Sequence, residues 1–302
     1  MALYALNLNT YHTEKKMIAI KKLEELHIDE LSSYLNHYQE TTMFIRNNLY
    51  HSGITYQDVP FHGEYYGSYE NNKLNGVLVH YWNGNVMMQA ESFSALSALI
   101  DEFKLKKIRP IGGILGEDTQ ANFVIERLGL QSSQFAINYQ EKLFLLNLDK
   151  MIIPQSMDSY NCTLKTLQDC EMDVIKEWLI AYHIEALGDD LNNPKLEESI
   201  IDEIQDTKLS QNRWVLFVNN IPVSLCGFNA KLPDIVQLGP VYTPPSLRNK
   251  GFARITVYLC LEQAAAQQVK RAILFTNDNS AICAYQALGF HEIGKYRLAL
   301  LK

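Results

Sequence analysis

The residues best suited to chemistry lie in one short turn in the second half of the chain. This turn carries three cations around a glycine, in the order Arg248, Asn249, Lys250, Gly251, Phe252, Ala253 and Arg254. A strand-like run, 235–243, precedes it, and an apolar, Ala-rich stretch of helical length, 255–268, follows it. Where a strand turns through glycine into a helix, backbone N–H groups and the positive end of the helix dipole meet. The turn is therefore predicted to hold a phosphate group.

A second group of residues follows this turn and contains a tyrosine in a helix-like segment. Residues 278–290 read Asp-Asn-Ser-Ala-Ile-Cys-Ala-Tyr-Gln-Ala-Leu-Gly-Phe, so that Asp278 begins the segment and Tyr285 lies in its middle. A tyrosine hydroxyl has a pKa of about 10, is protonated at neutral pH and can act as an acid. Tyr285 is therefore a candidate for proton donation, and simple packing in the core is its structural alternative.

Together the two segments resemble the GNAT superfamily of N-acetyltransferases. Residues 248–253 fit the family's Arg/Gln-x-x-Gly-x-Gly/Ala signature. Residues 278–290 fit its Asn-x-x-Ala-x-x-x-Tyr-x-x-x-Gly-Phe pattern, with Asp278 in place of the usual Asn. The resemblance covers residues 160–302. The first half is similar in the order of its elements only and lacks the phosphate signature, so we expect a degenerate GNAT-like domain there.

The resemblance implies that acetyl-CoA is the acyl donor and co-substrate, and that an amine acceptor attacks it directly in a ternary complex. The turn would donate backbone N–H groups to the pyrophosphate of CoA. The Gly-Pro pair within 235–243 is compatible with a β-bulge that leaves the strand end free to pair with the pantetheine arm. In the family, a backbone N–H at such a bulge, here that of Tyr242, points at the thioester oxygen, and Tyr285 protonates the leaving thiolate. The expected cofactor-binding residues are Val241, Tyr242, Thr243, Arg248, Asn249, Lys250, Gly251, Phe252, Ala253, Arg254 and Asp278.

The acceptor side is indicated by charge rather than by a motif. Between residues 171 and 206 the chain carries eleven acidic residues and two lysines. This imbalance favours a cationic amine acceptor, either a small molecule or a protein. Within the same region, His183 or Glu185 could take a proton from an ammonium group, directly or through water. The alternatives are an ordinary acidic surface and, for these two side chains, a solvated helix face.

The elements that must position these residues follow from apolar periodicity and turn residues. They predict an α/β (α+β) fold of two GNAT-like domains in tandem, each a mixed, mainly antiparallel sheet flanked by helices. The expected domains are residues 1–153 and residues 160–302, joined by a polar linker.

Within the first domain, a helix is expected over 28–49, and turns rich in Asn and Gly at 71–73 and 83–85 indicate an antiparallel meander. Closing strands are expected at 144–148 in this domain and at 290–301 in the second domain.

Charge and composition exclude several other classes of protein. The formal net charge of −7, with no basic stripe, argues against nucleic-acid binding. No apolar run approaches the ~20 residues of a membrane helix, and the first residues lack the pattern of a secretory leader. Five cysteines without a Cys-x-x-Cys pair predict reduced thiols in the cytoplasm, and the histidines lack metal-binding spacing. A monomer or homodimer is expected. A catalytically silent acyl-CoA-binding sensor and an interaction scaffold remain as alternative functions.

Overall fold

The computed structural model describes residues 18–302, apart from the side chains of residues 207–210. The N-terminal residues on which the expectation about a leader depended lie outside this range. The elements of the first half are β1 Ala19–Lys22, α1 Ile28–Leu35, α2 Met43–Ser52, β2 Gly63–Glu70, β3 Lys73–Tyr81, β4 Asn85–Ala90, α3 Phe93–Lys106, β5 Gly113–Glu117, α4 Asp118–Leu128 and β6 Phe135–Asn147.

The second half repeats this order of strands and helices. Its elements are β7 Cys162–Thr166, α5 Met172–Tyr182, a π-helical turn His183–Leu187, α6 Leu196–Ser210, β8 Arg213–Val218, β9 Ile221–Lys231, β10 Ile235–Tyr242, α7 Phe252–Ala266, β11 Arg271–Thr276, α8 Asn279–Gln286 and β12 His291–Leu301. Short 3-10 turns lie at Glu25–His27, Asn36–Tyr38, Ser132–Gln134, Leu148–Lys150, Gln155–Ser159, Leu167–Asp169 and Pro245–Leu247.

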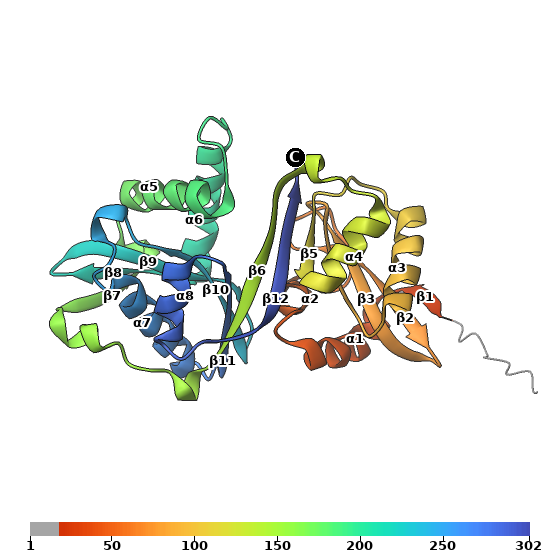
Figure 1. The fold of residues 1–302 in the computed structure, drawn as a ribbon, viewed down its shortest axis with the longest axis horizontal. Coiled ribbons are helices and arrows are strands. Elements are labelled where there is room, and N and C mark those ends of the chain that lie inside the picture. Colours follow the sequence, from red (N-terminus) through yellow and green to blue (C-terminus); the bar gives the residue numbers. More distant parts are fainter. Residues whose placement is uncertain (1–17) are drawn as a thin grey trace, which may run out of the picture.

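The two halves exchange their last strands. The described residues form one sheet of 12 strands in the order β1-β2-β3-β4-β5-β12-β6-β11-β10-β9-β8-β7. Strand β6 from the first half pairs with β11 of the second, and β12 from the second half pairs with β5 of the first. These two long strands run side by side between the halves (Figure 1). Only β4–β5 and β10–β11 pair in parallel within the described sheet, which agrees with the predicted mixed, mainly antiparallel fold.

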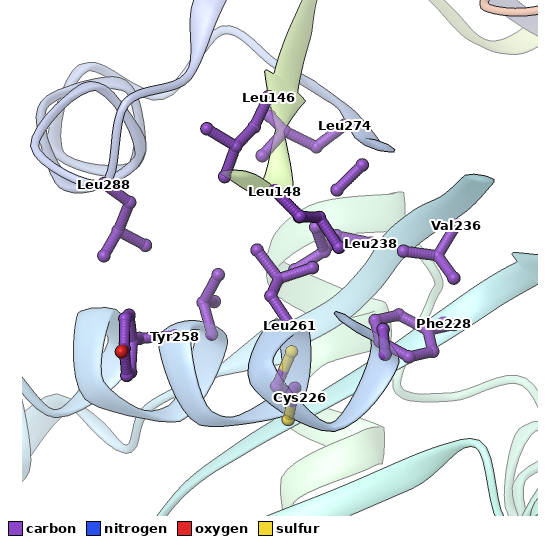
Figure 2. Close-up of a cluster of buried hydrophobic side chains, with 14 of the residues drawn as sticks. Leu146, Leu148, Cys226, Phe228, Val236, Leu238, Tyr258, Leu261, Leu274 and Leu288 are labelled. Atoms are coloured by element: carbon purple, nitrogen blue, oxygen red, sulfur yellow. The ribbon is translucent and has the colours of Figure 1, made fainter. Parts of the chain in front are cut away.

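Helices cover both faces of the sheet in each half. Side chains alternate between the faces along a strand, and apolar side chains on both faces are buried by these helices. In the second half, α7 packs on one face over a buried cluster in which Leu261 points toward Leu238 of β10 (Figure 2). Helices α5 and α6 pack on the opposite face, where Leu179 meets Leu225 of β9. The face that α5 and α6 cover is continuous with the face that α2 covers, where Met43 packs against Leu143 and Ile273.

Polar contacts reinforce this junction between the halves. Arg46 of α2 contacts Asp234 at 3.3 Å, and Arg271 at the start of β11 contacts the other oxygen of Asp234 at 3.0 Å and Glu40 at 2.9 Å. Asn47 also accepts a hydrogen bond from the backbone N–H of Lys231 at 2.9 Å. The first half is therefore tied to the second by strands, by apolar packing and by ion pairs.

One predicted helix is wrong in its extent. The segment expected to be helical over 28–49 is divided into α1 and α2, with a 3-10 turn between them. The Thr42 hydroxyl donates to the carbonyl oxygens of Leu35 at 3.2 Å and Tyr38 at 2.7 Å, so a side chain satisfies groups that a continuous helix would satisfy with backbone N–H groups. Among the described helices, none has the length and apolar character needed to cross a bilayer.

Candidate functional site

The candidate site begins where two parallel strands part. Strands β10 and β11 pair only at residues 235–237 and 271–273, whereas β11 continues to Thr276 alongside β6. The register of β10 with β9 shifts between Gln237 and Leu238 and again between Leu238 and Val241, which confirms the bulge predicted at Gly-Pro. Beyond it, β10 pairs with β9 alone among the described strands. The other edge of β10, including Val241 and Tyr242, is thus available to an added strand-like ligand.

The predicted phosphate turn follows directly and is shaped by left-handed residues. Asn249 and Gly251 have φ of 64° and 83°, and helix α7 begins at the next residue, Phe252. Gly251 is the N-cap and makes no side-chain cap, so the first N–H groups of α7, including those of Ala253 and Arg254, are left without the usual side-chain acceptor. A side chain on Gly251 would place its Cβ 2.7 Å from the Ser156 hydroxyl, too close for the present packing.

The linker between the halves lies against this turn. The Ser156 Oγ is buried and has no hydrogen-bond partner in the described structure. Nearby, the ring of Tyr160 packs edge-on to that of Phe252 at 5.1 Å, and its hydroxyl donates to the carbonyl oxygen of Lys250 at 3.4 Å. Because an unpaired buried hydroxyl costs free energy, an anion bound at the turn would give Ser156 a favourable partner.

The three predicted cations differ in their contacts. Arg248 donates to the carbonyl oxygen of Thr243 at 2.9 Å and to the Glu185 carboxylate at 2.6 Å, and it lies over the Tyr242 ring at 5.8 Å. It therefore joins the end of β10 to the segment after α5. The guanidinium of Arg254 lies near the turn, 3.8 Å from the position of a Cβ on Gly251, and the Lys250 side chain is exposed.

Helix α8 places Tyr285 against the core below the parted strands. Its ring lies 5.8 Å from that of Phe290, and its hydroxyl makes no hydrogen bond within the described part of the chain. Burial raises the pKa of Tyr285, which keeps the hydroxyl protonated. Asp278, predicted to meet the pantetheine arm, accepts the backbone N–H of Ala281 at 2.7 Å and so caps α8. The adjacent Asn277 bonds the backbone of β6 at Gln140 and Lys142.

The two residues proposed from sequence as proton acceptors are both engaged. His183 lies between the carboxylates of Asp189, at 2.8 Å, and Glu203, at 3.0 Å, and Glu203 also contacts Arg213. Burial by itself would lower the pKa of His183, but the hydrogen bonds and charges of these two carboxylates outweigh burial and raise it. Glu185 is paired with Arg248. Their roles as bases stay a prediction.

Two residues near the parted strands were given no functional role from sequence. Burial raises the pKa of Tyr182, at the end of α5, to about 12, and the charges of Arg213, Glu203 and Glu141 also act on it. The pKa of Tyr285 is raised mainly by burial, and the Tyr182 hydroxyl is one of the groups that raise it further. The sequence offers a weak indication for Tyr182, because this residue directly precedes His183 on an acidic helix. It offers no indication for Glu141, because Glu141 belongs to β6 of the other half and lies beside β11 only through the strand exchange.

Among the described residues, no group of three or more His, Cys, Asp or Glu side chains is arranged so that it could hold a metal ion. The chemistry available here consists of backbone N–H groups, cations, buried hydroxyls and carboxylates.

Comparison with known proteins assigns the second half to a family. Residues 172–290 match the model of the acetyltransferase (GNAT) family. No curated protein matches the chain. A GNAT-family acetyltransferase from Colwellia psychrerythraea is 15% identical, with 94% of this chain and 100% of that chain covered and a TM-score of 0.52.

Two further solved structures match almost the whole chain. A tandem GNAT protein from the clavulanic acid biosynthesis pathway is 8% identical, covering 94% of this chain and 98% of its own, with a TM-score of 0.54. A Drosophila protein is 11% identical, covering 93% and 98%, with a TM-score of 0.64. At these identities the likeness concerns the fold. The chain therefore has the fold of a tandem GNAT protein, and its second half contains, at residues 172–290, a domain of the acetyltransferase (GNAT) family.

Proposed function

We propose that this chain transfers an acetyl group from acetyl-CoA to an amine acceptor in a ternary complex. The observation that carries this proposal is the uncapped start of α7 beside the point where β10 and β11 part. A helix N-terminus suits a pyrophosphate, and a free strand edge suits an extended, amide-containing arm. The free edge of β10 ends at Tyr242 and the start of α7 follows at Phe252, so one elongated ligand could contact both.

The residues of the turn fit the proposed donor. Backbone N–H groups at the start of α7 would bind the pyrophosphate, and the absence of a side chain on Gly251 allows close approach. Lys250 and Arg254 add positive charge, while Arg248 holds the end of β10 through Thr243. Val241 and Thr243 would flank the pantetheine arm along the free edge, with Asn249, Phe252, Ala253 and Asp278 completing the proposed donor site.

The chemical step needs a polarised carbonyl, a neutral amine and a protonated leaving group. The backbone N–H of Tyr242 is the proposed donor to the thioester oxygen. The amine nitrogen attacks the carbonyl carbon, the carbon–sulfur bond breaks, and the Tyr285 hydroxyl gives its proton to the departing sulfur. The excess proton on the new amide nitrogen then restores Tyr285. Burial raises the pKa of Tyr285, so its hydroxyl carries the proton that this step requires, although the higher pKa also makes it a weaker acid.

Within residues 18–153, the helix that corresponds to α7 does not begin with a free donor site of this kind. The start of α3 is capped by Ser92, whose Oγ accepts the N–H of Ala95 at 3.2 Å, and the acidic Glu91 precedes it. The Gln120 side chain accepts the N–H of Ala90 at 2.8 Å, next to the end of β4. Because this helix start is already capped and carries negative charge nearby, we assign donor binding to residues 160–302 and a supporting role to residues 1–153.

The proposed acceptor is a cationic amine, because carboxylates predominate along α5 and α6. The five cysteines of the chain are free thiols, and Cys226 and Cys260 are buried. Free thiols are usual in a reducing compartment, so we propose the cytoplasm as the place of this reaction.

Thiol release from acetyl-CoA in the presence of a panel of primary amines tests this function. We expect release that depends on the amine. Tyr285→Phe should lower kcat about 100-fold, because general acid catalysis typically contributes at least that much, and should leave the Kd for acetyl-CoA unchanged. The exposed Tyr50→Phe serves as the matched control and should keep the wild-type rate. Binding of acetyl-CoA without turnover on any amine would instead favour a sensor.

A further inference from the structure

We propose that Glu141 accepts the proton of the acceptor ammonium, so that the first half supplies a catalytic residue to the site of the second. This inference rests on the acyl-transfer function proposed above and adds the residue that makes the amine nucleophilic. It also specifies the acceptor as a primary or secondary amine that arrives protonated.

The strand exchange places Glu141 at the required end of the sheet. In the pairing of β6 with β11, Lys142 lies opposite Thr276, the last residue of β11. Glu141 is therefore the next residue beyond the end of β11, on the side where β10 and β11 have parted. If β6 had stayed with β5 in its own half, this carboxylate would lie outside the second domain's site.

The side chain of Glu141 lies on the face that would receive the acceptor. Residues alternate along a strand, so Glu141 shares the face of Leu143, which packs against Met43 under α2. The face is the one that α5 and α6 cover farther along the sheet. On the other side of Glu141, the hydroxyl of Tyr139 lies 3.7 Å from the position of a Cβ on Gly188, so the connection after α5 approaches the strand there.

Strand pairing places Glu141 beside a tyrosine of the other half. Tyr296 of β12 lies directly opposite Glu141 in the pairing of β6 with β12. The charge of Glu141 is also one of the lesser causes that raise the pKa of Tyr182, at the end of α5. Base and acid would therefore be provided by different halves of the chain, as a direct-attack mechanism needs for two separate proton transfers.

Glu141 differs from the other carboxylates around the site in having no partner. Asp278 caps a helix, Glu185 contacts Arg248, and Glu203 contacts Arg213 and His183, which also holds Asp189. No hydrogen bond or ion pair reaches the Glu141 carboxylate from the residues that the structure describes.

Burial raises the pKa of Glu141, and no charge of a neighbouring element offsets it. The titratable groups on the elements around it include Tyr296, opposite Glu141 on β12, and Tyr182 on α5, whose pKa the charge of Glu141 helps to raise. On its own strand, Tyr139 shares its face and Lys142 follows it. Glu141 is partly buried. A partly desolvated carboxylate without a partner costs free energy, and a bound ammonium would supply that partner.

The proposed step is a proton transfer that balances without any further reactant. One N–H bond of the ammonium breaks and an O–H bond forms on Glu141, which leaves the amine neutral with its lone pair free. The lone pair attacks the thioester carbon, and Tyr285 protonates the sulfur as described above. The proton on Glu141 passes to solvent before the next turnover, so the net products are the amide, the free thiol and one proton.

The test compares Glu141→Gln with the wild-type protein and with Glu292→Gln, an exposed glutamate paired with Lys142. We expect Glu141→Gln to lower kcat/KM at least about 100-fold at neutral pH, to leave the Kd for acetyl-CoA unchanged and to remove the acidic limb of the pH–rate profile. Glu292→Gln should retain wild-type values. The loss should shrink with an arylamine acceptor such as an aniline, which is neutral at the assay pH and needs no deprotonation before attack.

Stability separates this role from a structural one. Because Glu141→Gln removes a partly buried charge that has no partner, the variant should melt at the wild-type temperature or above it at neutral pH. A lower melting temperature together with weaker acetyl-CoA binding would overturn the proposal, as would a kcat/KM within about threefold of wild type. A wild-type protein that transfers no acetyl group overturns both proposals, whereas an active Glu141→Gln variant overturns only this one.

Discussion

The phosphate turn allows a sharp test, because one added methyl group should affect binding and folding differently. Gly251 adopts φ of 83°, a conformation that costs a residue with a Cβ about 1–2 kcal/mol. The new Cβ of Gly251→Ala would also lie 2.7 Å from the Ser156 hydroxyl, which must rotate away. We expect a loss of about 1–2 kcal/mol in the free energy of unfolding, which a folded chain of this size tolerates.

The effect on binding should be larger than this strain alone explains. A hydrogen bond from a backbone N–H to a charged phosphate contributes about 1.5–3 kcal/mol, so displacing the pyrophosphate from one such donor raises Kd about 10- to 100-fold. Isothermal titration calorimetry with acetyl-CoA measures the change directly.

Gly129→Ala is the matched control for this substitution. Gly129 has φ of 70° and ends α4 with open space where its Cβ would lie. It should lose similar stability yet keep the wild-type Kd. A folded Gly251→Ala protein whose Kd for acetyl-CoA lies within twofold of wild type would refute the placement of the pyrophosphate at this turn.

Two further predictions concern stability. Asp234→Ala leaves Arg46 and Arg271 without their shared carboxylate at the junction of the halves. Because Asp234 is partly exposed, we expect the free energy of unfolding in urea to fall by about 2 kcal/mol. The exposed Asp101→Ala is the control and should cost less than about 1 kcal/mol, so equal losses would contradict a special role of the junction. The raised pKa of His183 contributes stability that is fully present below the ordinary pKa of 6.5 and is lost as the pH rises through the folded-state pKa. His183→Gln should therefore flatten the pH dependence of the unfolding free energy in that window. An unchanged slope would argue against a histidine paired with carboxylates.

Local features of the site could be predicted from the sequence because they depend on neighbouring residues. The left-handed glycine before α7, the bulge at Gly-Pro and the helix that carries Tyr285 all occur where the pattern placed them. Each depends on backbone geometry within a few residues, which residue type constrains directly.

Contacts between distant segments could not be predicted in the same way. The sequence predicts strands at 144–148 and 290–301, whereas β6 begins earlier, at Phe135. A strand-like run does not say which neighbour the strand pairs with, so the exchange could not be predicted. For the same reason, the sequence did not indicate that Glu141 of β6 would lie next to the second domain. Arg248 and Glu185 were each singled out for a different role, and nothing in their spacing indicated that they would form an ion pair.

If the second half alone holds the donor site, each chain binds one acetyl-CoA, and calorimetric titration of the wild-type protein with acetyl-CoA measures this stoichiometry. We predict saturable binding with one site per chain, because the start of α7 is uncapped and the start of α3 is capped by Ser92. Two equivalent sites would contradict the assignment of the first half, and the absence of any binding would contradict the account of the site as a whole.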